Sequence, residues 1–526
     1  MKDEKEIIKF FLKKKILINK EIIKKLSENN IDINKFYEEI KNKTNLDSCL
    51  ILDQYIDNFL NSENKDINWK EYDKSVVLAG KGDKTIHEKF TKIMEEPTKT
   101  EQDNTKKINP SIKIVFSYEE NIKKREVQDF VTFFNKRFSH LEGLLKNRNE
   151  MQNLLSIKRV KQKREKDNIS IIAIVTTKKT TKNGNIILNV EDKTESVNVL
   201  INKNKPELFR QATNIVLDEI IGVNGVNGDN IVFANNVIWP EVPSTKIIKK
   251  AEKEEYAIFL SDLHVGSSFF LEENFLKFLK WLNGEIGNED QKQISEKVKY
   301  IFIIGDLVDG CGIYPGQEKE LILKDIYEQY NACGDFLKKI PERIQLIICP
   351  GNHDAMRIAE PQPILYQDFA KAIWDLPNAT LVSNPSMVNI ASSEGFSGFD
   401  VLLYHGYSFD YYVANVDEIR QNGGYDRADL IMKFLLKRRH LAPTHTSTLY
   451  IPDINKDNLV IEKIPDFFVT GHIHKTSVSS YKNITLICGS CWQSKTPFQE
   501  KVGHHPEPCR VPIVNLKSRE IKIMRF

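Results

Sequence analysis

The stretch "ICPGNHDAMR", Ile348 to Arg357, places an amide, an imidazole and a carboxylate side by side at the end of an apolar run. The run stops at Pro350 and Gly351. Because Pro, Gly, Asn and Asp are the usual turn residues, a simple turn is the plainest interpretation. The carboxyl end of a buried strand is also where open α/β sheets carry their ligands. The other strand ends of the chain distinguish these two interpretations.

Four further apolar runs end in polar residues in the same way. They are "YAIFLSD", "YIFIIGD", "VLLYHG" and "DFFVTGH". Runs of this kind, alternating with helical patterns, indicate a buried α/β sheet that carries its chemistry at the strand ends. The side chains that the five runs deliver are Asp262, His264, Asp306, Asp309, Asn352, His353, His405, His472 and His474. Five of the chain's 11 histidines are in this set, which argues against coincidence.

The residue types in this set favour a metal centre. Imidazole together with carboxylate and amide oxygen suits Mn, Fe, Zn or Co, whereas an all-oxygen set would suggest Mg or Ca. The candidate ligands exceed what one ion needs, so we predict two ions about 3.5–4 Å apart that share one carboxylate. Such a pair lowers the pKa of a bridging water and clamps the phosphoryl oxygens of an in-line displacement.

Five motifs in this order, "DLH", "GDLVDG", "GNHD", "YHG" and "GHIH", resemble those of the calcineurin-like metallophosphoesterase superfamily. The resemblance implies a ligand set: Asp262, His264 and His474 for one ion, Asp306 as the bridge, and Asn352, His405 and His472 for the other.

The same resemblance gives three further residues supporting roles. His353 is not a ligand; it faces the scissile phosphate and acts as a proton donor. Asp309 and Asp354 are expected to orient residues of the site. We expect Asp354 to hold the His353 imidazole in its working tautomer.

A narrower resemblance lies outside the metal motifs. "SDLHVGS" (261–267), "LLKRRHLAPTH" (435–445) and "CWQSKTPFQ" (491–499) are similar to the small subunit of archaeal family D DNA polymerase. The resemblance covers about residues 110 to 526 well. It implies 3′→5′ proofreading exonuclease activity with two divalent ions, manganese first, with Fe, Zn or Mg as alternatives. It also implies three partners: a large catalytic polymerase subunit, primer-template DNA with single-stranded 3′ ends, and a sliding clamp or other replisome protein.

Two other functions stay open at this point: a non-catalytic assembly subunit of the polymerase, and a DNA-repair metallonuclease. The basic pair Arg438 and Arg439 is open in the same way. It would bind DNA phosphates, or it would form a solvated helix end or a subunit salt bridge.

The chain divides into four segments by pattern. Residues 1–75 show apolar positions at helical spacing and predict a helical N-terminal module, to which we assign clamp or replisome contacts. Polar residues 76–109 predict a flexible linker. Residues 110–245 contain short β-type runs and predict a domain built on an OB-fold barrel. Residues 252–526 predict the phosphoesterase, an α/β/β/α sandwich.

Composition adds further limits. A net charge of +3 over 526 residues means that any DNA contact must come from local patches. Long apolar runs and a signal-peptide core are missing, so we expect a cytoplasmic protein without membrane association. Seven scattered cysteines fit a reducing compartment. Whether a zinc ion binds at the C-terminal cysteines and histidines stays open for Cys488, Cys491, Cys509, His504 and His505.

Overall fold

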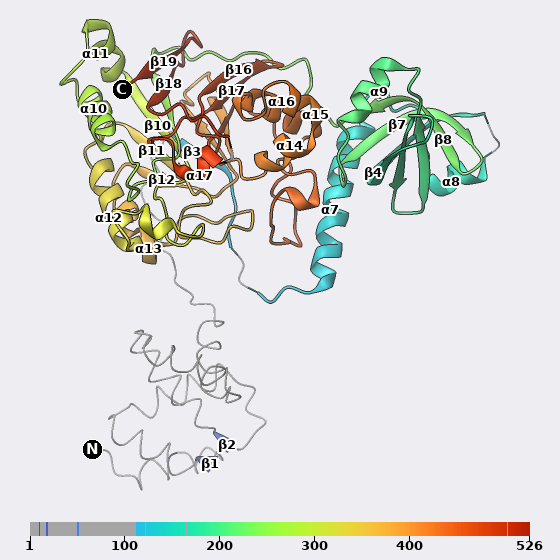
Figure 1. Ribbon diagram of the computed structural model, residues 1–526, viewed down its shortest axis with the longest axis horizontal. Coiled ribbons are helices and arrows are strands. Elements are labelled where there is room, and N and C mark those ends of the chain that lie inside the picture. Colours follow the sequence, from blue (N-terminus) through green and yellow to red (C-terminus); the bar gives the residue numbers. More distant parts are fainter. Residues whose placement is uncertain are drawn as a thin grey trace. The chain divides into compact units, whose positions relative to one another are not determined.

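The computed structural model describes residues 10, 17–18, 50–51, 112–120, 123–163, 166–501 and 503–526. The chain forms two compact units, Met1–Gln102 and Asp103–Phe526. In the first, the strands β1 (Leu17–Ile18) and β2 (Leu50–Ile51) pair in parallel. The predicted helical module and linker lie almost entirely outside the described residues. The second unit contains the remaining elements (Figure 1).

One six-stranded sheet has the order β12-β11-β10-β9-β18-β19. Its strands are β9 (Tyr256–Leu260), β10 (Val298–Ile304), β11 (Gln345–Cys349), β12 (Ala379–Leu381), β18 (Arg510–Asn515) and β19 (Ile521–Arg525). Strands β9 to β12 run parallel, and β18 and β19 are antiparallel. Because β9 and β11 are buried at every position, they read as unbroken apolar runs. The parallel arrangement brings their carboxyl ends to one edge.

The second six-stranded sheet has the order β16-β17-β15-β14-β13-β3. Its strands are β3 (Ile112–Ser117), β13 (Ser386–Ile390), β14 (Phe399–Leu403), β15 (Phe467–Thr470), β16 (Ser477–Tyr481) and β17 (Ile484–Cys488). Here the structure differs from the predicted boundary at residue 110. Strand β3 pairs with β13, over 260 residues further along the chain, and Ile112 is buried between the two six-stranded sheets. This strand therefore belongs to the two-sheet domain and not to the barrel domain.

The two sheets pack face to face. Phe259 and Phe302 of the first sheet stack with ring centroids 5.0 Å apart, and Phe467 of the second lies 6.1 Å from Phe259. Helices cover the outer faces: α10 (Glu272–Leu282), α11 (Glu289–Glu296), α12 (Ile326–Leu337) and α13 (Gln367–Trp374) on the first sheet, and α14 (Phe409–Asn415), α15 (Asp417–Gln421) and α16 (Ala428–Arg438) on the second. The result is the four-layer α/β/β/α arrangement that the sequence predicts.

Short helical segments complete this domain. They are η1 (Gln317–Lys319), η2 (Gly424–Asp426), η3 (His445–Ser447) and α17 (Pro497–Lys501).

A closed five-stranded barrel with the order β4-β5-β6-β8-β7 forms the other part of this unit. Its elements are β4 (Asn168–Thr180), β5 (Ile186–Glu191), β6 (Ser196–Ile201), α9 (Pro206–Thr213), β7 (Ile220–Gly228) and β8 (Ile231–Ile238). Alternate residues of β5, namely Ile186, Leu188 and Val190, fill its interior. Helices α7 (Val127–Lys146) and α8 (Ile157–Gln162) precede it. Within the described residues, every helix is too short or too polar to cross a membrane.

Candidate metal centre

The predicted strand-end residues converge at one edge of the sandwich. The loops after β9, β10 and β11 carry one part of the set, and the loops after β14 and β15 carry the other. These residues are Asp262, His264, Asp306, Asn352 and His353 from the first sheet, and His405, His472 and His474 from the second. Asp262, His264, Asp306, His405 and His474 are all buried.

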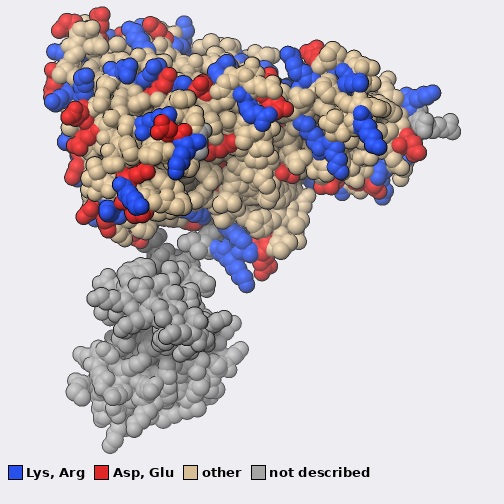
Figure 2. Space-filling view, in the orientation of Figure 1, with Lys and Arg blue, Asp and Glu red and all other residues tan. Residues whose placement is uncertain are grey.

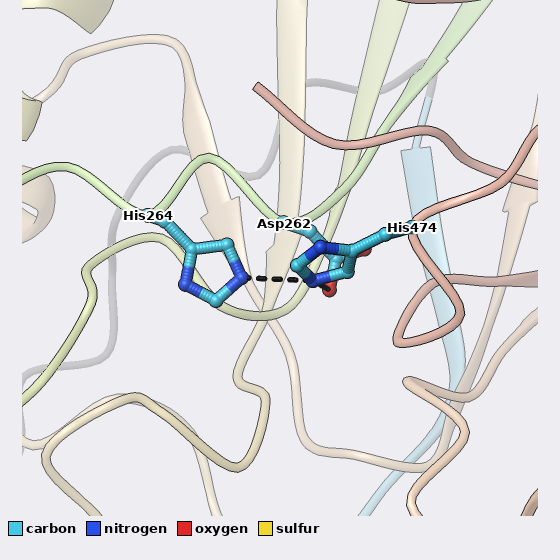
Figure 3. A group of neighbouring side chains, drawn as sticks. All are labelled: Asp262, His264 and His474. Carbon is cyan, nitrogen blue, oxygen red and sulfur yellow. Dashed lines mark hydrogen bonds and ion pairs between the residues drawn. The ribbon is translucent and has the colours of Figure 1, made fainter. Parts of the chain in front are cut away.

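Asp262, His264 and His474 point toward a common centre (Figure 3). The Nε2 atoms of His264 and His474 lie 3.0 Å apart. The Nε2 atom of His474 lies 3.4 Å from a carboxylate oxygen of Asp262. Two imidazole nitrogens and one carboxylate oxygen at this spacing can serve as ligands of a single ion.

Asp306 stands between this trio and a second group. Its Oδ2 atom lies 3.9 Å from Nε2 of His264 and 3.3 Å from Nε2 of His405. The same His405 nitrogen lies 2.9 Å from Oδ1 of Asn352. Asp306 is therefore the carboxylate that both groups can share.

The second ring nitrogen of each histidine has a neighbour of its own. Nδ1 of His264 lies 3.1 Å from Asp309, and Nδ1 of His405 lies 2.9 Å from the carbonyl oxygen of Ile304. Nδ1 of His474 contacts the Gln499 amide at 2.9 Å. An Nδ1–H that faces a carboxylate or carbonyl oxygen, as at His264 and His405, fixes the orientation of a metal-binding imidazole. The three contacts leave Nε2 of all three rings facing the common centre.

The backbone at five of these residues adopts the left-handed region. The φ angles are 52° at Asp262, His264 and Asp306, 70° at His472 and 58° at His474. Residues other than glycine rarely adopt this conformation, and such strain clusters at functional sites. The strand ends are thus bent so that these side chains face one another.

Two glycines allow the loops to approach closely. A β-carbon at Gly351 would collide with the Asp306 carboxylate, and one at Gly305, where φ is 78°, would collide with the His405 ring. Gly351 of the opening stretch is therefore required by packing.

The charge balance of the site suits cations. Burial alone would raise the pKa of Asp306, but His405 and His353 outweigh it and hold that pKa well below its ordinary value. Burial would lower the pKa of His405, but Asp306 and Asp262 raise it to about 10. The buried carboxylates therefore favour positive charge beside them, as the raised pKa of His405 reflects. Divalent ions would supply this charge in place of protons, so the residues fit a metal pair.

The structure corrects the role predicted for Asp354. Nδ1 of His353 lies 2.8 Å from the carbonyl oxygen of Asp309, so Asp309 and not Asp354 holds this ring. Asp354 is turned inward, where it accepts hydrogen bonds from the Gly351 amide at 2.8 Å and the Tyr330 hydroxyl at 3.0 Å. Burial, together with the charge of Asp306, raises its pKa to about 7. Asp354 therefore supports the loop at Gly351 and is not the residue that orients the His353 imidazole.

His472 has a partner that sequence reasoning missed. Its Nε2 atom lies 3.1 Å from Oδ2 of Asp410 in α14, which leaves Nδ1 as the available nitrogen. The His472 ring is adjacent to His405, with centroids 5.3 Å apart. Asp410 follows "YHG" by only a few residues, but nothing in that pattern marks it.

Three glutamines around the site were also missed. Gln493 donates a hydrogen bond to Oδ1 of Asp309 at 2.9 Å, and Gln317 donates to Oδ2 at 3.0 Å. Gln499 is the partner of His474 described above. Gln493 and Gln499 lie in "CWQSKTPFQ", so the similarity of that segment was the available signal.

Arg438 and Arg439 do not form a DNA-binding surface. Both are 4% exposed. Arg438 forms an ion pair with Glu219 of the barrel, and Arg439 donates a hydrogen bond at 2.7 Å to the carbonyl oxygen of Ile461. Basic and acidic side chains alternate over the face shown in Figure 2. The prediction of phosphate contacts at this pair is therefore wrong, and so is the alternative of a solvated helix end; the salt bridge of Arg438 lies within the chain and not between subunits.

The C-terminal cysteines lie close to the site without forming a metal-binding group. Among the described residues, every group that could hold an ion consists of Asp and His. The Cys491 thiol faces the carbonyl oxygens of His474 and Gln493, and His504 packs against Tyr425.

Comparisons with known proteins agree with this geometry. Residues 257–476 match the model of the calcineurin-like phosphoesterase family. The DNA polymerase II small subunit of Methanothermobacter thermautotrophicus is 38% identical over 390 residues, which cover 74% of this chain and 78% of that protein. The chain belongs to the DNA polymerase II small-subunit family. The resemblance to archaeal family D small subunits is thereby confirmed.

Another member of this small-subunit family is longer. The DNA polymerase II small subunit of Pyrococcus abyssi is 38% identical over 403 residues, 76% of this chain and 63% of that protein. Among solved structures, an archaeal phosphodiesterase aligns with 52% of this chain and 99% of its own at 10% identity and a TM-score of 0.25.

Proposed function

We propose that this small subunit is a metal-dependent 3′→5′ DNA exonuclease that removes the terminal nucleotide by phosphodiester hydrolysis. The observation that carries the proposal is the convergence of buried Asp262, His264, Asp306, His405 and His474, whose carboxylate oxygens and imidazole nitrogens face one another. A purely structural role would not require five left-handed backbone positions or imidazoles that face one another.

The ligand assignment follows from the two groups that share Asp306. Asp262, His264 and His474 would hold one divalent ion, and Asn352, His405 and His472 the other. Mn²⁺ is the first candidate because the set mixes nitrogen and oxygen donors, and Fe²⁺, Zn²⁺ or Mg²⁺ are alternatives. When bound, such a pair activates a water and stabilises charge on the phosphoryl oxygens.

We assign protonation of the leaving group to His353. Its backbone N–H donates to Oδ1 of Asp306 at 2.8 Å, which fixes the loop beside the shared carboxylate. Because the Asp309 carbonyl accepts from Nδ1–H, Nε2 is the atom that can carry the mobile proton. In the reaction, His353 would pass this proton to the 3′ oxygen that leaves. Asp309 thereby orients both His264 and His353.

The substrate would be a single-stranded or mismatched 3′ end. A site at a sheet edge reaches a backbone phosphate only where the strand is separated from its complement. Unpairing a correct terminus costs about 1–2 kcal/mol per base-pair step, and a mismatched terminus has already lost much of this. Excision should therefore favour mispaired ends, which is the selectivity that proofreading needs.

The large catalytic polymerase subunit is the proposed partner, because the related proteins are named as small subunits. The barrel supports this reading: five strands in the order β4-β5-β6-β8-β7, with α9 before β7, match an OB-fold. The barrel and the outer face of the phosphoesterase would form the contact. We assign the contact with a sliding clamp or another replisome protein to the predicted helical module 1–75.

A nuclease assay on the full chain co-purified with its large subunit tests the proposal. Labelled primers with paired, mismatched and single-stranded 3′ ends are incubated with Mn²⁺, Mg²⁺, Fe²⁺ or Zn²⁺, and Asp306→Asn is the control. We expect metal-dependent release of nucleotides, fastest from unpaired ends. Absence of release with every metal, in a complex that still assembles, would leave a non-catalytic assembly subunit. Cleavage by a chain that fails to bind the large subunit would favour a repair nuclease.

A further inference from the structure

A partly exposed aromatic pair lies near the candidate metal centre and has no part in the reaction described so far. The rings of Tyr314 and Phe498 stack with centroids 5.6 Å apart and planes inclined by 19°. Tyr314 lies in the segment after β10, and Phe498 lies in α17. Phe498 is 51% exposed and the neighbouring Ile313 is 37% exposed. Tyr314 is partly buried, and Phe498 and Ile313 give this side of the pair an apolar surface open to solvent.

The Phe498 side of the pair is tied to the metal centre by its neighbour in sequence. Gln499 contacts His474 at 2.9 Å. The backbone of this segment is fixed because Thr496 and Gln499 exchange hydrogen bonds at 3.1 and 3.2 Å. Phe498 thus projects from a rigid turn whose next residue touches a candidate ligand.

The Tyr314 side is tied to the centre through Asp309. Gln317 donates to the carbonyl oxygen of Asp309 at 2.9 Å and accepts from the Ile313 amide at 2.9 Å. The Tyr314 hydroxyl donates to Glu320 at 2.8 Å, which fixes the ring. A β-carbon at Gly310 would collide with both the His353 carbonyl and the Ile313 side chain. The segment that carries Tyr314 is therefore packed against the loop that carries His353.

We propose that Tyr314 and Phe498 form a stacking platform for a nucleobase of the DNA strand, within one nucleotide of the scissile phosphodiester. This inference rests on the proposed function and names how the site holds its substrate. Aromatic rings bind single strands by stacking on bases, which is tolerant of sequence because every base has a π-face. Metal ions held by the buried carboxylates and imidazoles can bind a phosphate but do not contact the base, and this pair would supply that contact.

The test changes a base of the DNA strand and the side chain at position 498 in combination. Nucleotide release is measured for the full complex on single-stranded oligonucleotides that carry an abasic residue at the terminal or penultimate position, or at neither. Wild-type protein should lose about 10-fold in kcat/KM when the base is missing at one of these positions. Phe498→Ala should lose a similar factor on the normal strand and show little further loss on the abasic one. Phe498→Trp should retain the wild-type difference.

A matched control is Tyr327→Ala. Tyr327 is 48% exposed and forms a similar pair with Phe369, at 5.5 Å, on helices α12 and α13. This variant should behave as wild type on every strand. If Phe498→Ala keeps the full wild-type difference between normal and abasic ends, the platform is overturned and the pair only packs two loops together.

A second measurement separates this inference from the proposed function. Oligonucleotides with 2-aminopurine at either position are bound in EDTA, where no cleavage occurs. Quenching of the fluorescence by wild-type protein, but not by Phe498→Ala, supports stacking even if no nuclease activity is found. Equal fluorescence for both proteins argues against the platform. Failure of the nuclease assay in wild type argues against the proposed function alone.

Discussion

The guanidinium of Arg438, at the end of α16, donates a hydrogen bond to the carboxylate of Glu219 in the barrel. Both side chains are almost completely buried, at 3% and 1% exposure. Arg438 also donates at 2.7 Å to the carbonyl oxygen of Asn214. This ion pair joins the phosphoesterase to the barrel, so it sets the geometry between the two parts.

Replacing Arg438 with alanine should therefore destabilise the protein and leave DNA binding unaffected. The variant leaves Glu219 buried and unpaired, which costs about 3–5 kcal/mol. We expect a lower urea midpoint and a salt dependence of DNA binding equal to that of wild type. The double variant Arg438→Met, Glu219→Leu removes both charges and should recover most of the loss. A smaller salt slope for Arg438→Ala would restore the DNA-binding interpretation.

The candidate metal centre could be predicted from the sequence because each candidate ligand closely follows an apolar strand, so strand pattern and residue type mark the same positions. The burial of Arg438 and Arg439 could not be predicted, because "KRRH" looks like a solvated helix end and only tertiary contacts bury the two side chains. Asp410 and the role of Asp309 toward His353 depend on contacts between loops. Strand β3 is six residues long and pairs far along the chain, which local pattern cannot reveal.

Asp306→Asn should abolish nuclease activity with little change in folding. Asp306 is the carboxylate that both ligand groups share, and an amide there removes its negative charge. The surrounding sheet is unchanged, so circular dichroism and assembly should match wild type. Metal content, measured by mass spectrometry, should fall. A variant that degrades 3′ ends at the parent rate would contradict the assignment of Asp306.

Asp410→Asn should weaken binding at the second group of ligands. The carboxylate holds Nε2 of His472, and losing such a partner typically costs 10–100-fold in metal affinity or activity. The readout is the Mn²⁺ concentration that gives half-maximal nucleotide release. Asp417→Asn, which alters an exposed carboxylate paired with Arg420, is the control and should be silent. Equal Mn²⁺ requirements for Asp410→Asn and wild type would show that Asp410 does not position His472.

The junction between α7 and the phosphoesterase should weaken in acid. Burial, helped by Arg137, lowers the pKa of His440 to about 4, while Asp457 opposes the shift. Nε2 of His440 lies 2.9 Å from Asp457, and its Nδ1 accepts from the Ala442 amide, so the ring is neutral. In the unfolded chain the His440 imidazole binds a proton below about pH 6.5, whereas in the folded chain it binds one only near pH 4.

Stability from this group is therefore complete above pH 6.5 and is lost as the pH falls toward 4. Urea midpoints of wild type and His440→Gln are compared at pH 7 and pH 4.5. The wild-type midpoint should fall further, because glutamine does not titrate and the other acid-sensitive groups are shared. Parallel changes in both proteins would show that His440 is not responsible.

His353→Ala should separate catalysis from metal binding. In the proposed reaction His353 donates a proton to the leaving 3′ oxygen and is not a ligand, so metal content should stay near that of wild type. The rate should fall by about 10²–10⁴, the usual contribution of general acid–base catalysis. The loss should shrink for a substrate whose leaving group is a nitrophenolate, because that group departs without a proton. Loss of metal together with activity would instead make His353 a ligand, which its place near His264 and Asp306 allows geometrically.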